Sequence, residues 1–212
     1  MIKSYAVLGL GSFGTSVART LMEMGMEVLA ADRRKDLVAA VAPDVTYAVQ
    51  VDVTNEKALC SIGLERMDGA IIAIGENLEA SVMATILVKE MGVPFVVAKA
   101  ETEMQKNILE KVGADKVVFP EKEMGIRLGR NIAGNFLDNF NLSPEVSMVE
   151  IPVKEEWIGK TLKELDFRNR YHLNIVAFRR FEELDSFPHP DDILQEGDII
   201  LAMGNNKDLS KV

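Results

Sequence analysis

The sequence is poor in several residue types on which common functions depend. Its 212 residues include a single cysteine, Cys60, so no internal disulfide can form and a reducing compartment is expected. Acidic residues outnumber basic ones by 33 to 24, and the net charge of −9 disfavours binding to nucleic acid or to anionic membranes. No apolar run reaches the roughly 18 residues of a membrane span, and the N-terminus does not resemble a signal peptide. These absences favour a cytoplasmic globular protein.

Residues that carry out catalysis are also scarce. The two histidines, His172 and His189, have no cysteine or histidine partner at metal-ligand spacing. None of the three tyrosines is followed four residues later by a lysine, the pair that moves a proton in many hydride-transfer enzymes. The sequence has no Gly-x-Ser-x-Gly motif and no Walker lysine. An enzyme is therefore disfavoured.

The first 140 residues alternate β-rich runs with helical patterns, and 48% apolar content suffices for a packed core. Strands are expected at Ser4–Leu8, Glu27–Ala31, Tyr47–Val51, Gly69–Ile74, Phe95–Ala98 and Lys116–Phe119. Helices are expected at Phe13–Gly25, Lys35–Val41, Glu56–Ile62, Leu78–Met91, Glu103–Val112 and Glu123–Leu137. This alternation predicts an α/β domain over residues 1–140, a Rossmann-like doubly wound parallel sheet covered on both faces.

A polar stretch with a proline, Asn139–Pro144, is interpreted as a linker. Residues 141–212 then predict a second domain, a small α+β module. Its expected strands are Val146–Val153, Asn174–Arg179 and Ile199–Met203, and its expected helices lie at Gly159–Leu165 and near Asn206–Val212.

The strongest functional signal is a glycine fingerprint at the end of the first strand. Gly9-x-Gly11-x-x-Gly14 joins that strand to a helix, and Asp32 ends the second strand. In this context the first glycine permits the turn, the second lets a phosphate approach, and the third lets helix and strand pack. The helix N-terminus attracts phosphate, and the acid accepts ribose hydroxyls. The motif predicts a nucleotide site; a glycine turn that only packs is the alternative.

Polar residues follow the third and fourth strands as well. Asp52 is placed to accept the adenine amino group, whereas Thr54 either contacts the ligand or caps the next helix. After the fourth strand, Gly75 permits close backbone approach, while Asn77 is explained equally well as a helix N-cap.

Two charged residues lie at the ends of the last two strands. Lys99 ends the fifth strand and is predicted to face phosphate rather than solvent. Glu121 follows the sixth strand, where a carboxylate either holds a divalent cation beside phosphates or is an ordinary acid at a helix start. The residues alone favour the second interpretation.

Stretches along the whole chain resemble the cytosolic RCK (KTN) subunits of Ktr/Trk-type bacterial potassium uptake systems. In the first domain these are Ala6–Gly14, Ala73–Asn77, Leu87–Val93 and Gly113–Glu121. In the second domain, which resembles the RCK-C or TrkA-C module, they are Met148–Ile151, Gly159–Leu165 and Glu196–Leu201. Gly-Ala-Asp followed by an apolar strand and Pro-Glu is the most specific of these patterns.

The resemblance implies a non-catalytic gating subunit. Such subunits form homo-oligomeric rings, usually octamers of four dimers, at the cytoplasmic face of a membrane-embedded potassium-translocating subunit. ATP, ADP or NAD(H) binds the first domain and controls potassium flow.

By resemblance, the glycines cradle phosphates, Asp32 takes the ribose, Asp52 lies near the adenine and Lys99 near the phosphates. Glu121 then holds Mg²⁺ or Ca²⁺ at an ATP-bound dimer interface. The predicted nucleotide-binding residues are Gly9, Gly11, Ser12, Phe13, Gly14, Asp32, Arg33, Asp52, Val53, Ile74, Gly75, Asn77, Lys99 and Glu121.

Two further points follow from the resemblance. Where this chain has Ser12, close relatives carry an arginine that reaches the neighbouring subunit's γ-phosphate, so discrimination of ATP from ADP is in doubt. Residues Arg168, Asn174, Ile175 and Pro188 match positions by which relatives bind cyclic di-AMP. The alternative is structural: Ile175 fits a core strand, and Arg168 fits a surface ion pair.

Two competing functions remain. A small NAD(P)-dependent oxidoreductase is disfavoured by the missing proton donor and substrate domain. A redox-sensing transcription regulator is disfavoured by the acidic charge and by the lack of a helix-turn-helix.

Overall fold

A computed structural model describes residues 3–134 and 136–212 of the chain. The chain divides into two compact units, Met1–Lys122 and Glu123–Val212, which are described separately below. The expected helix at Glu123–Leu137 includes Asn135, which lies outside the described residues. None of the helices formed by the described residues is long and apolar enough to cross a membrane.

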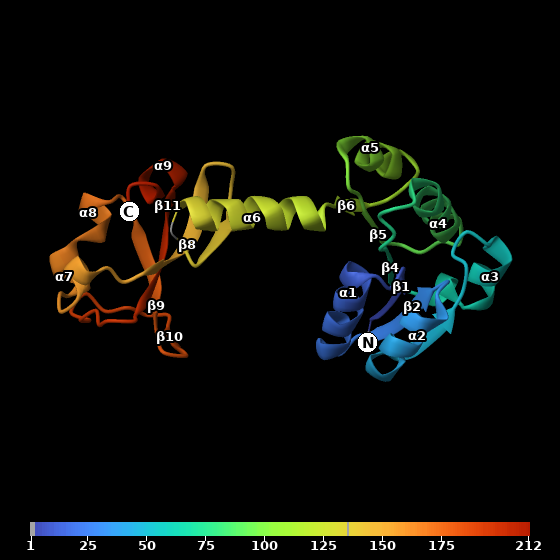
Figure 1. Cartoon of the computed structure of the whole chain (residues 1–212), viewed down its shortest axis with the longest axis horizontal. Helices are drawn as coiled ribbons and strands as arrows, with labels where there is room; N and C mark the ends of the chain where they lie inside the picture. Colours follow the sequence, from blue (N-terminus) through green and yellow to red (C-terminus); the bar gives the residue numbers. More distant parts are fainter. Residues whose placement is uncertain (1–2, 135) are drawn as a thin grey trace. The chain divides into compact units, whose positions relative to one another are not determined.

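The N-terminal unit is built on a parallel sheet (Figure 1). Its strands are β1 Ser4–Leu8, β2 Glu27–Asp32, β3 Tyr47–Gln50, β4 Gly69–Ile72, β5 Val96–Lys99 and β6 Lys116–Val118. They lie in the order β3-β2-β1-β4-β5-β6, so the strand order reverses between β1 and β4. This confirms the predicted Rossmann-like fold, and all carboxyl ends meet at one edge of the sheet, where such folds bind ligands.

Helices cover both faces of this sheet. They are α1 Ser12–Glu23, α2 Lys35–Val41, α3 Glu56–Ser61, α4 Leu78–Glu90 and α5 Glu103–Lys111, with short 3₁₀ turns at Ala42–Asp44 and Leu64–Arg66. Helix α6 Pro120–Gly134 begins after β6 and belongs mostly to the C-terminal unit. Successive β1 residues alternate between two cores: Val7 packs with Ala18 of α1, whereas Leu8 belongs to the core that includes Leu87 of α4 and Leu109 of α5. Burial on both faces explains the continuous apolar strands seen in the sequence.

The C-terminal unit contains an antiparallel sheet in the order β10-β9-β11-β8-β7. Its strands are β7 Asp138–Asn141, β8 Val146–Pro152, β9 Asn174–Arg180, β10 Glu183–Asp185 and β11 Ile199–Asn205. Its short helices are α7 Leu162–Leu165, α8 Phe167–Arg170 and α9 Asn206–Leu209, with a 3₁₀ turn at Glu155–Trp157. Trp157 is 1% exposed, and its ring lies edge-on to Phe167 at 5.0 Å and to Tyr171 at 6.1 Å. This aromatic cluster anchors the core of the small module.

The stretch interpreted as a linker is a strand, so that prediction was wrong. Residues 138–141 form β7, which pairs antiparallel with β8, and the proline lies in the turn that joins them. The Ser143 side chain stabilises this turn by accepting a hydrogen bond from Val146 N at 3.1 Å. Asparagines and a proline resemble a linker in composition, yet a short hairpin needs the same residue types. The compact units accordingly separate near Lys122 and Glu123, whereas the sequence placed the boundary at residues 140 and 141.

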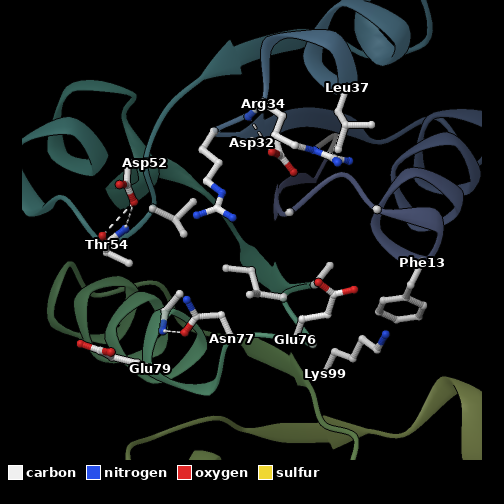
Figure 2. Close-up of a pocket in the computed structure, with 18 of the residues that line it drawn as sticks. Phe13, Asp32, Arg34, Leu37, Asp52, Thr54, Glu76, Asn77, Glu79 and Lys99 are labelled. Carbon is white, nitrogen blue, oxygen red and sulfur yellow. Dashed lines mark hydrogen bonds between the residues drawn. The ribbon is translucent and has the colours of Figure 1, made fainter.

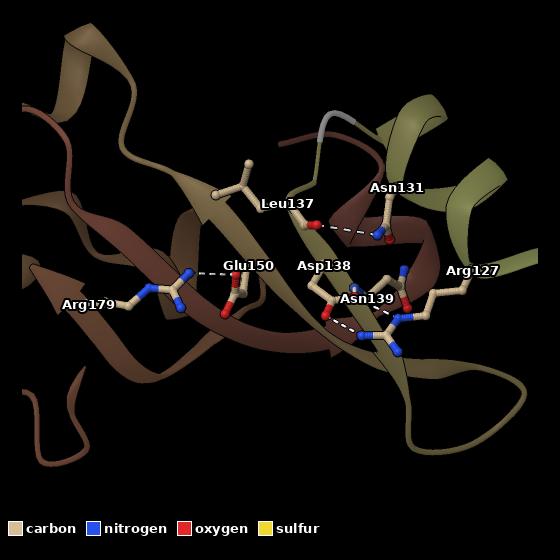
Figure 3. Close-up of polar contacts among 7 residues, drawn as sticks. All are labelled: Arg127, Asn131, Leu137, Asp138, Asn139, Glu150 and Arg179. Atoms are coloured by element: carbon tan, nitrogen blue, oxygen red, sulfur yellow. Dashed lines mark hydrogen bonds and ion pairs between the residues drawn. The ribbon is translucent and has the colours of Figure 1, made fainter. Parts of the chain in front are cut away.

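Polar contacts fasten β7 to α6 within the C-terminal unit (Figure 3). Arg127 of α6 donates to both carboxylate oxygens of Asp138, with Nε to Oδ1 at 2.8 Å. This bidentate pair lowers the pKa of Asp138 and raises that of Arg127. Nearby, Arg179 of β9 donates to Glu150 of β8 at 2.9 Å. Charged pairs thus connect α6 with β7 and, across β11, β9 with β8.

Candidate nucleotide-binding site

A cavity of about 810 Å³ lies at the carboxyl edge of the parallel sheet (Figure 2). The loops that follow β1, β2, β3 and β4 line it, together with the ends of β5 and α6. Its volume is in the range of small-molecule and cofactor sites. The cavity therefore lies where the strand order predicts a ligand crevice.

The reason for a glycine differs among the three fingerprint positions. Gly9 has φ +103°, a conformation that other residues rarely adopt, and its N–H donates to Ala31 O at 2.8 Å. A Cβ at Gly14 would overlap the Gly9 carbonyl oxygen, so this position needs glycine for packing. A Cβ at Gly11 would meet no atom within 4 Å, because it would project into open space. The fold does not explain Gly11, whereas a ligand approaching the backbone there does.

Helix α1 begins at Ser12 directly after Gly11. Gly11 is the N-cap and has no side chain to accept a hydrogen bond, and the first turn contains no acidic residue. The backbone N–H groups of that turn therefore remain for an anion, and the helix dipole favours one. This arrangement fits a phosphate group at the glycine loop.

Asp32, at the end of β2, braces this loop. Its Oδ2 accepts a hydrogen bond from Leu10 N at 2.7 Å, and its Oδ1 accepts one from Arg34 N at 2.8 Å. An ionised carboxylate offers about four acceptor positions, so each oxygen keeps capacity for a ligand hydroxyl. Asp32 therefore positions the glycine loop and still keeps acceptor positions for a ligand hydroxyl. The sequence predicted only the second of these roles.

The acid after β3 is also held in place. Asp52 Oδ1 accepts hydrogen bonds from Thr54 N at 3.0 Å and from the Thr54 hydroxyl at 2.8 Å. These bonds hold the pKa of Asp52 below its usual value, and the charge of Arg33 adds to the effect. The N-cap of α3 is Asn55, which accepts from Ala58 N at 3.1 Å, so Thr54 is not the cap. Thr54 instead orients Asp52 toward the cavity wall (Figure 2).

Lys99 and Glu121 form an ion pair at the opposite wall. Lys99 Nζ lies 2.5 Å from Glu121 Oε1, and only 11% of the Lys99 side chain is exposed. The ammonium lowers the pKa of Glu121, whose side chain is 66% exposed. Glu101 adds a second carboxylate next to Gly75, where an added Cβ would overlap its oxygen. Lys99 is therefore not a simple solvated lysine, and Glu121 lies in the first turn of α6, because that helix starts at Pro120.

The structure brings almost all of the predicted residues together around one cavity. Thirteen of the fourteen line it, and Gly14 lies behind the loop as a packing residue. Asn77 lines the cavity and also caps α4, by accepting from Ala80 N at 3.0 Å, so both interpretations hold for it. The lining residues that the sequence did not single out are Arg34, Leu37, Val51, Ala73, Glu76, Glu79, Ala80, Met83 and Glu101. Arg34 and Glu101 each lie three residues beyond the predicted strand ends, Ala31 and Ala98, and this position near a strand end is the sequence signal that could have found them.

The four residues proposed for a second ligand lie in the C-terminal unit. Arg168 donates from Nε and Nη2 to Asn174 Oδ1 at 3.1 and 2.8 Å. Ile175 packs partly buried against the core of the module, and Pro188 lies in the loop between β10 and β11. Arg168 thus pairs with an amide rather than with a carboxylate, and its guanidinium keeps donors for an anion.

Among residues 3–134 and 136–212, no group of three or more His, Cys, Asp and Glu side chains converges to hold a metal ion. The described residues therefore do not surround Glu121 with a converging set of carboxylates at the cavity wall. A hard divalent cation needs about six oxygen ligands, so most of its shell must come from elsewhere.

Comparison with known proteins identifies the family. Residues 5–120 match the TrkA-N domain and residues 146–212 the TrkA-C domain. The Ktr system potassium uptake protein C of Bacillus subtilis (strain 168) is 40% identical over 212 residues, which cover 100% of this chain and 96% of that protein. The Ktr system potassium uptake protein A of the same organism is 37% identical over 210 residues, covering 99% and 95%.

A solved structure supports the fold. The RCK domain of GsuK superposes with a TM-score of 0.65 at 17% identity, covering 99% of this chain and 46% of that one. With a complete glycine loop, an acid after β2 and both domain matches in order, the chain belongs to the TrkA-N and TrkA-C family that includes the Ktr system potassium uptake proteins.

Proposed function

We propose that this chain is the nucleotide-binding regulatory subunit of a potassium uptake system. The observation that carries the proposal is the open space at Gly11, which faces the free N-terminus of α1 and lies beside Asp32. The end-to-end similarity to Ktr system potassium uptake proteins supplies the transport context. The ligand is an adenine nucleotide, ATP or ADP, or the dinucleotide NAD(H).

In this proposal each wall of the cavity contacts a different part of the nucleotide. The phosphates lie against Gly9, Gly11 and the first turn of α1, where backbone N–H groups are available. Asp32 accepts the ribose hydroxyls, and Asp52, held by Thr54, accepts the adenine amino group. Ser12 contributes no charge here, so the site relies on backbone donors and on Lys99 to contact the phosphates.

The alternative, a small NAD(P)-dependent oxidoreductase, needs a proton donor beside the reacting ring. The described residues that line the cavity include no histidine, cysteine or tyrosine, and Lys99 is already hydrogen-bonded to Glu121. The residues of the cavity therefore support binding and control rather than hydride transfer.

A divalent cation, Mg²⁺ or Ca²⁺, is proposed at Glu121 when a nucleoside triphosphate is bound. Phosphate oxygens, water and the same glutamate of a second copy could supply the remaining ligands that one carboxylate cannot. Divalent cation should raise the melting temperature more with ATP than with ADP, and Glu121→Gln should abolish the difference while ADP still binds. Glu103→Gln is the matched control, since Glu103 pairs with Lys122 at 2.6 Å outside the cavity. If Glu121→Gln keeps the full cation-dependent rise in melting temperature with ATP, Glu121 does not hold the cation.

The assembly proposed for the chain is a ring of dimers, an octamer, bound to a membrane-embedded potassium-translocating subunit. Its location is then the cytoplasm, at the inner face of the cell membrane.

The C-terminal unit is proposed to bind cyclic di-AMP through Arg168, Asn174, Ile175 and Pro188, where the Arg168 guanidinium offers donors to a phosphate. Nothing in the acidic composition favours nucleic acid as a partner.

Titration calorimetry on the purified chain with ATP, ADP, NAD⁺ and NADH tests the nucleotide proposal. Asp32→Ala should weaken binding about ten- to a hundredfold, because ribose hydroxyls lose their acceptor and the loop loses its brace. Asp36→Ala, an exposed acid in the first turn of α2 that does not line the cavity, is the control. Unchanged affinity in a folded Asp32→Ala variant would contradict the proposed site.

A further inference from the structure

The two walls of the cavity carry charge of opposite sign. Figure 2 shows Asp32 and Arg34 on one side and Glu76 and Lys99 on the other. The wall beside the end of β2 presents Arg33 and Arg34 with Asp32. The wall beside β5 and α6 presents Glu76, Glu101 and Glu121 around the one ammonium of Lys99. Positive charge is thus concentrated at the ribose end and negative charge at the far end.

The guanidiniums of Arg33 and Arg34 have no bonded partner in the described part of the chain. Within residues 3–134 and 136–212, neither guanidinium donates a hydrogen bond or forms an ion pair; the charge of Arg33 acts on Asp52 only at longer range. By contrast, Arg127, Arg179 and Arg180 each pair with a carboxylate. The two planar guanidiniums, each with five N–H donors, therefore line the cavity next to the position predicted for the ribose.

Asp32 does not by itself exclude a phosphate from this position. Both of its oxygens already accept backbone N–H groups, from Leu10 and from Arg34, so the carboxylate is turned toward the loop. In folds of this type the acid after the second strand binds the ribose 2′-hydroxyl, whereas a nearby arginine accommodates a 2′-phosphate. This chain has both residue types in sequence, and its remaining acceptors on Asp32 can take the 3′-hydroxyl.

We propose that Arg33 and Arg34 form a subsite for a phosphate on the adenosine ribose, so that the cavity prefers a 2′-phosphorylated adenine dinucleotide, NADP(H), to NAD(H). The proposal rests on the nucleotide site of the proposed function and specifies its ligand. The far wall fits the same ligand, because the pyridinium of NADP⁺ is a cation beside an excess of carboxylates. A triphosphate instead places its terminal charge at that acidic wall, where Ser12 supplies no compensating charge.

Calorimetry on the full chain tests the subsite with two matched ligand pairs. NADP⁺ is compared with NAD⁺, and adenosine 2′,5′-bisphosphate with 5′-AMP, which removes the nicotinamide from the comparison. The phosphorylated member of each pair should bind at least about tenfold more tightly, the gain expected from one or two charge-assisted bonds. The ratio of the two affinities within each pair should fall as the salt concentration rises from about 50 to about 300 mM, since both guanidiniums are exposed and salt screens their charge.

The double variant Arg33→Gln, Arg34→Gln should bring the ratio of NADP⁺ to NAD⁺ affinity to about one; any loss of affinity that both ligands share cancels in this ratio. Arg66→Gln is the matched control, because this arginine is 86% exposed and lies outside the cavity. NADP⁺ binding no tighter than NAD⁺, or a ratio that survives in the double variant, overturns the subsite. Binding of NAD⁺ or ATP without a preference for NADP⁺ removes only this inference, whereas a chain that binds no nucleotide removes the proposed function as well.

Discussion

The two units of the molecule use charged side chains in different ways. In the C-terminal unit, Arg180 donates to Asp198 at 2.9 and 2.7 Å, and Asp198 is 1% exposed. In the N-terminal unit, Arg33 and Arg34 line a cavity, and their guanidiniums have no bonded partner among the residues that the structure describes. Charges that pair inside a unit stabilise its fold, whereas charges left open at a sheet edge serve a ligand. Removal of a paired, buried charge should therefore lower stability, whereas removal of an open charge at the cavity should lower affinity.

The largest effect on stability should come from the aromatic core of the C-terminal unit. Trp157→Ala should lower the free energy of unfolding by about 3–5 kcal/mol, because it empties the centre of the Trp157, Phe167 and Tyr171 cluster. Urea unfolding followed by circular dichroism measures the change, since the chain has no other tryptophan to follow by fluorescence. Phe187→Ala, at a ring that is 89% exposed, is the control and should cost little. A cost below about 1 kcal/mol for Trp157→Ala would contradict the assigned core.

The buried acid of the C-terminal unit should give the next largest effect. Asp198→Ala should cost about 2–3 kcal/mol at neutral pH, because Arg180 and the Gln195 N–H lose their acceptor. Asp191→Ala, whose side chain is 72% exposed, is the control.

This effect should also depend on pH. The hydrogen bonds from Arg180 lower the pKa of Asp198 in the folded state. Its stabilisation is therefore present above the unfolded pKa of about 3.9 and is lost as pH falls through the lower folded value. The difference in stability between wild type and Asp198→Ala should shrink below about pH 4 in denaturant titrations. A difference that grows on acidification would contradict the pairing.

A smaller effect is expected where the charged pair is more exposed. Arg127→Gln should lower stability by less than Asp198→Ala does, because Arg127 and Asp138 are 39% and 25% exposed and solvent screens the pair. Hydrogen exchange should speed up in β7, which this pair fastens to α6 (Figure 3). Lys106→Gln, which breaks a surface pair with Glu110, should change stability by less than about 0.5 kcal/mol. Equal effects of the two variants would show that Arg127 does not hold β7.

The sequence predicted the N-terminal unit better than the C-terminal one, for physical reasons. Parallel strands buried on both faces are continuous apolar runs, and the helices between them have caps such as Asn77 and Thr102. In the small module, β7 has a composition typical of a linker, and β10 is a three-residue strand with no buried residue. Such strands are fixed by pairing with neighbours, and pairing is not visible in a local pattern.

The cavity could be predicted in outline but not in its electrostatics. Residues at the carboxyl ends of strands follow from the fold, and that rule found Asp32, Asp52, Lys99 and Glu121. It did not show that the backbone N–H groups of Leu10 and Arg34 donate hydrogen bonds to the Asp32 carboxylate, or that Lys99 already pairs with Glu121. These contacts depend on side-chain directions and on residues distant in sequence, so only the structure shows them.

Calorimetry and thermal melting on variants of two glycines in the same loop test most directly whether the N-terminal unit is a nucleotide sensor. Gly11→Ala places a methyl group in open space, so the melting temperature should stay near that of wild type while nucleotide affinity falls at least about tenfold. Gly14→Ala should lower the melting temperature, because its Cβ would overlap the Gly9 carbonyl oxygen. A Gly11→Ala variant that melts like wild type and binds ATP and NAD⁺ with unchanged affinity would contradict the account.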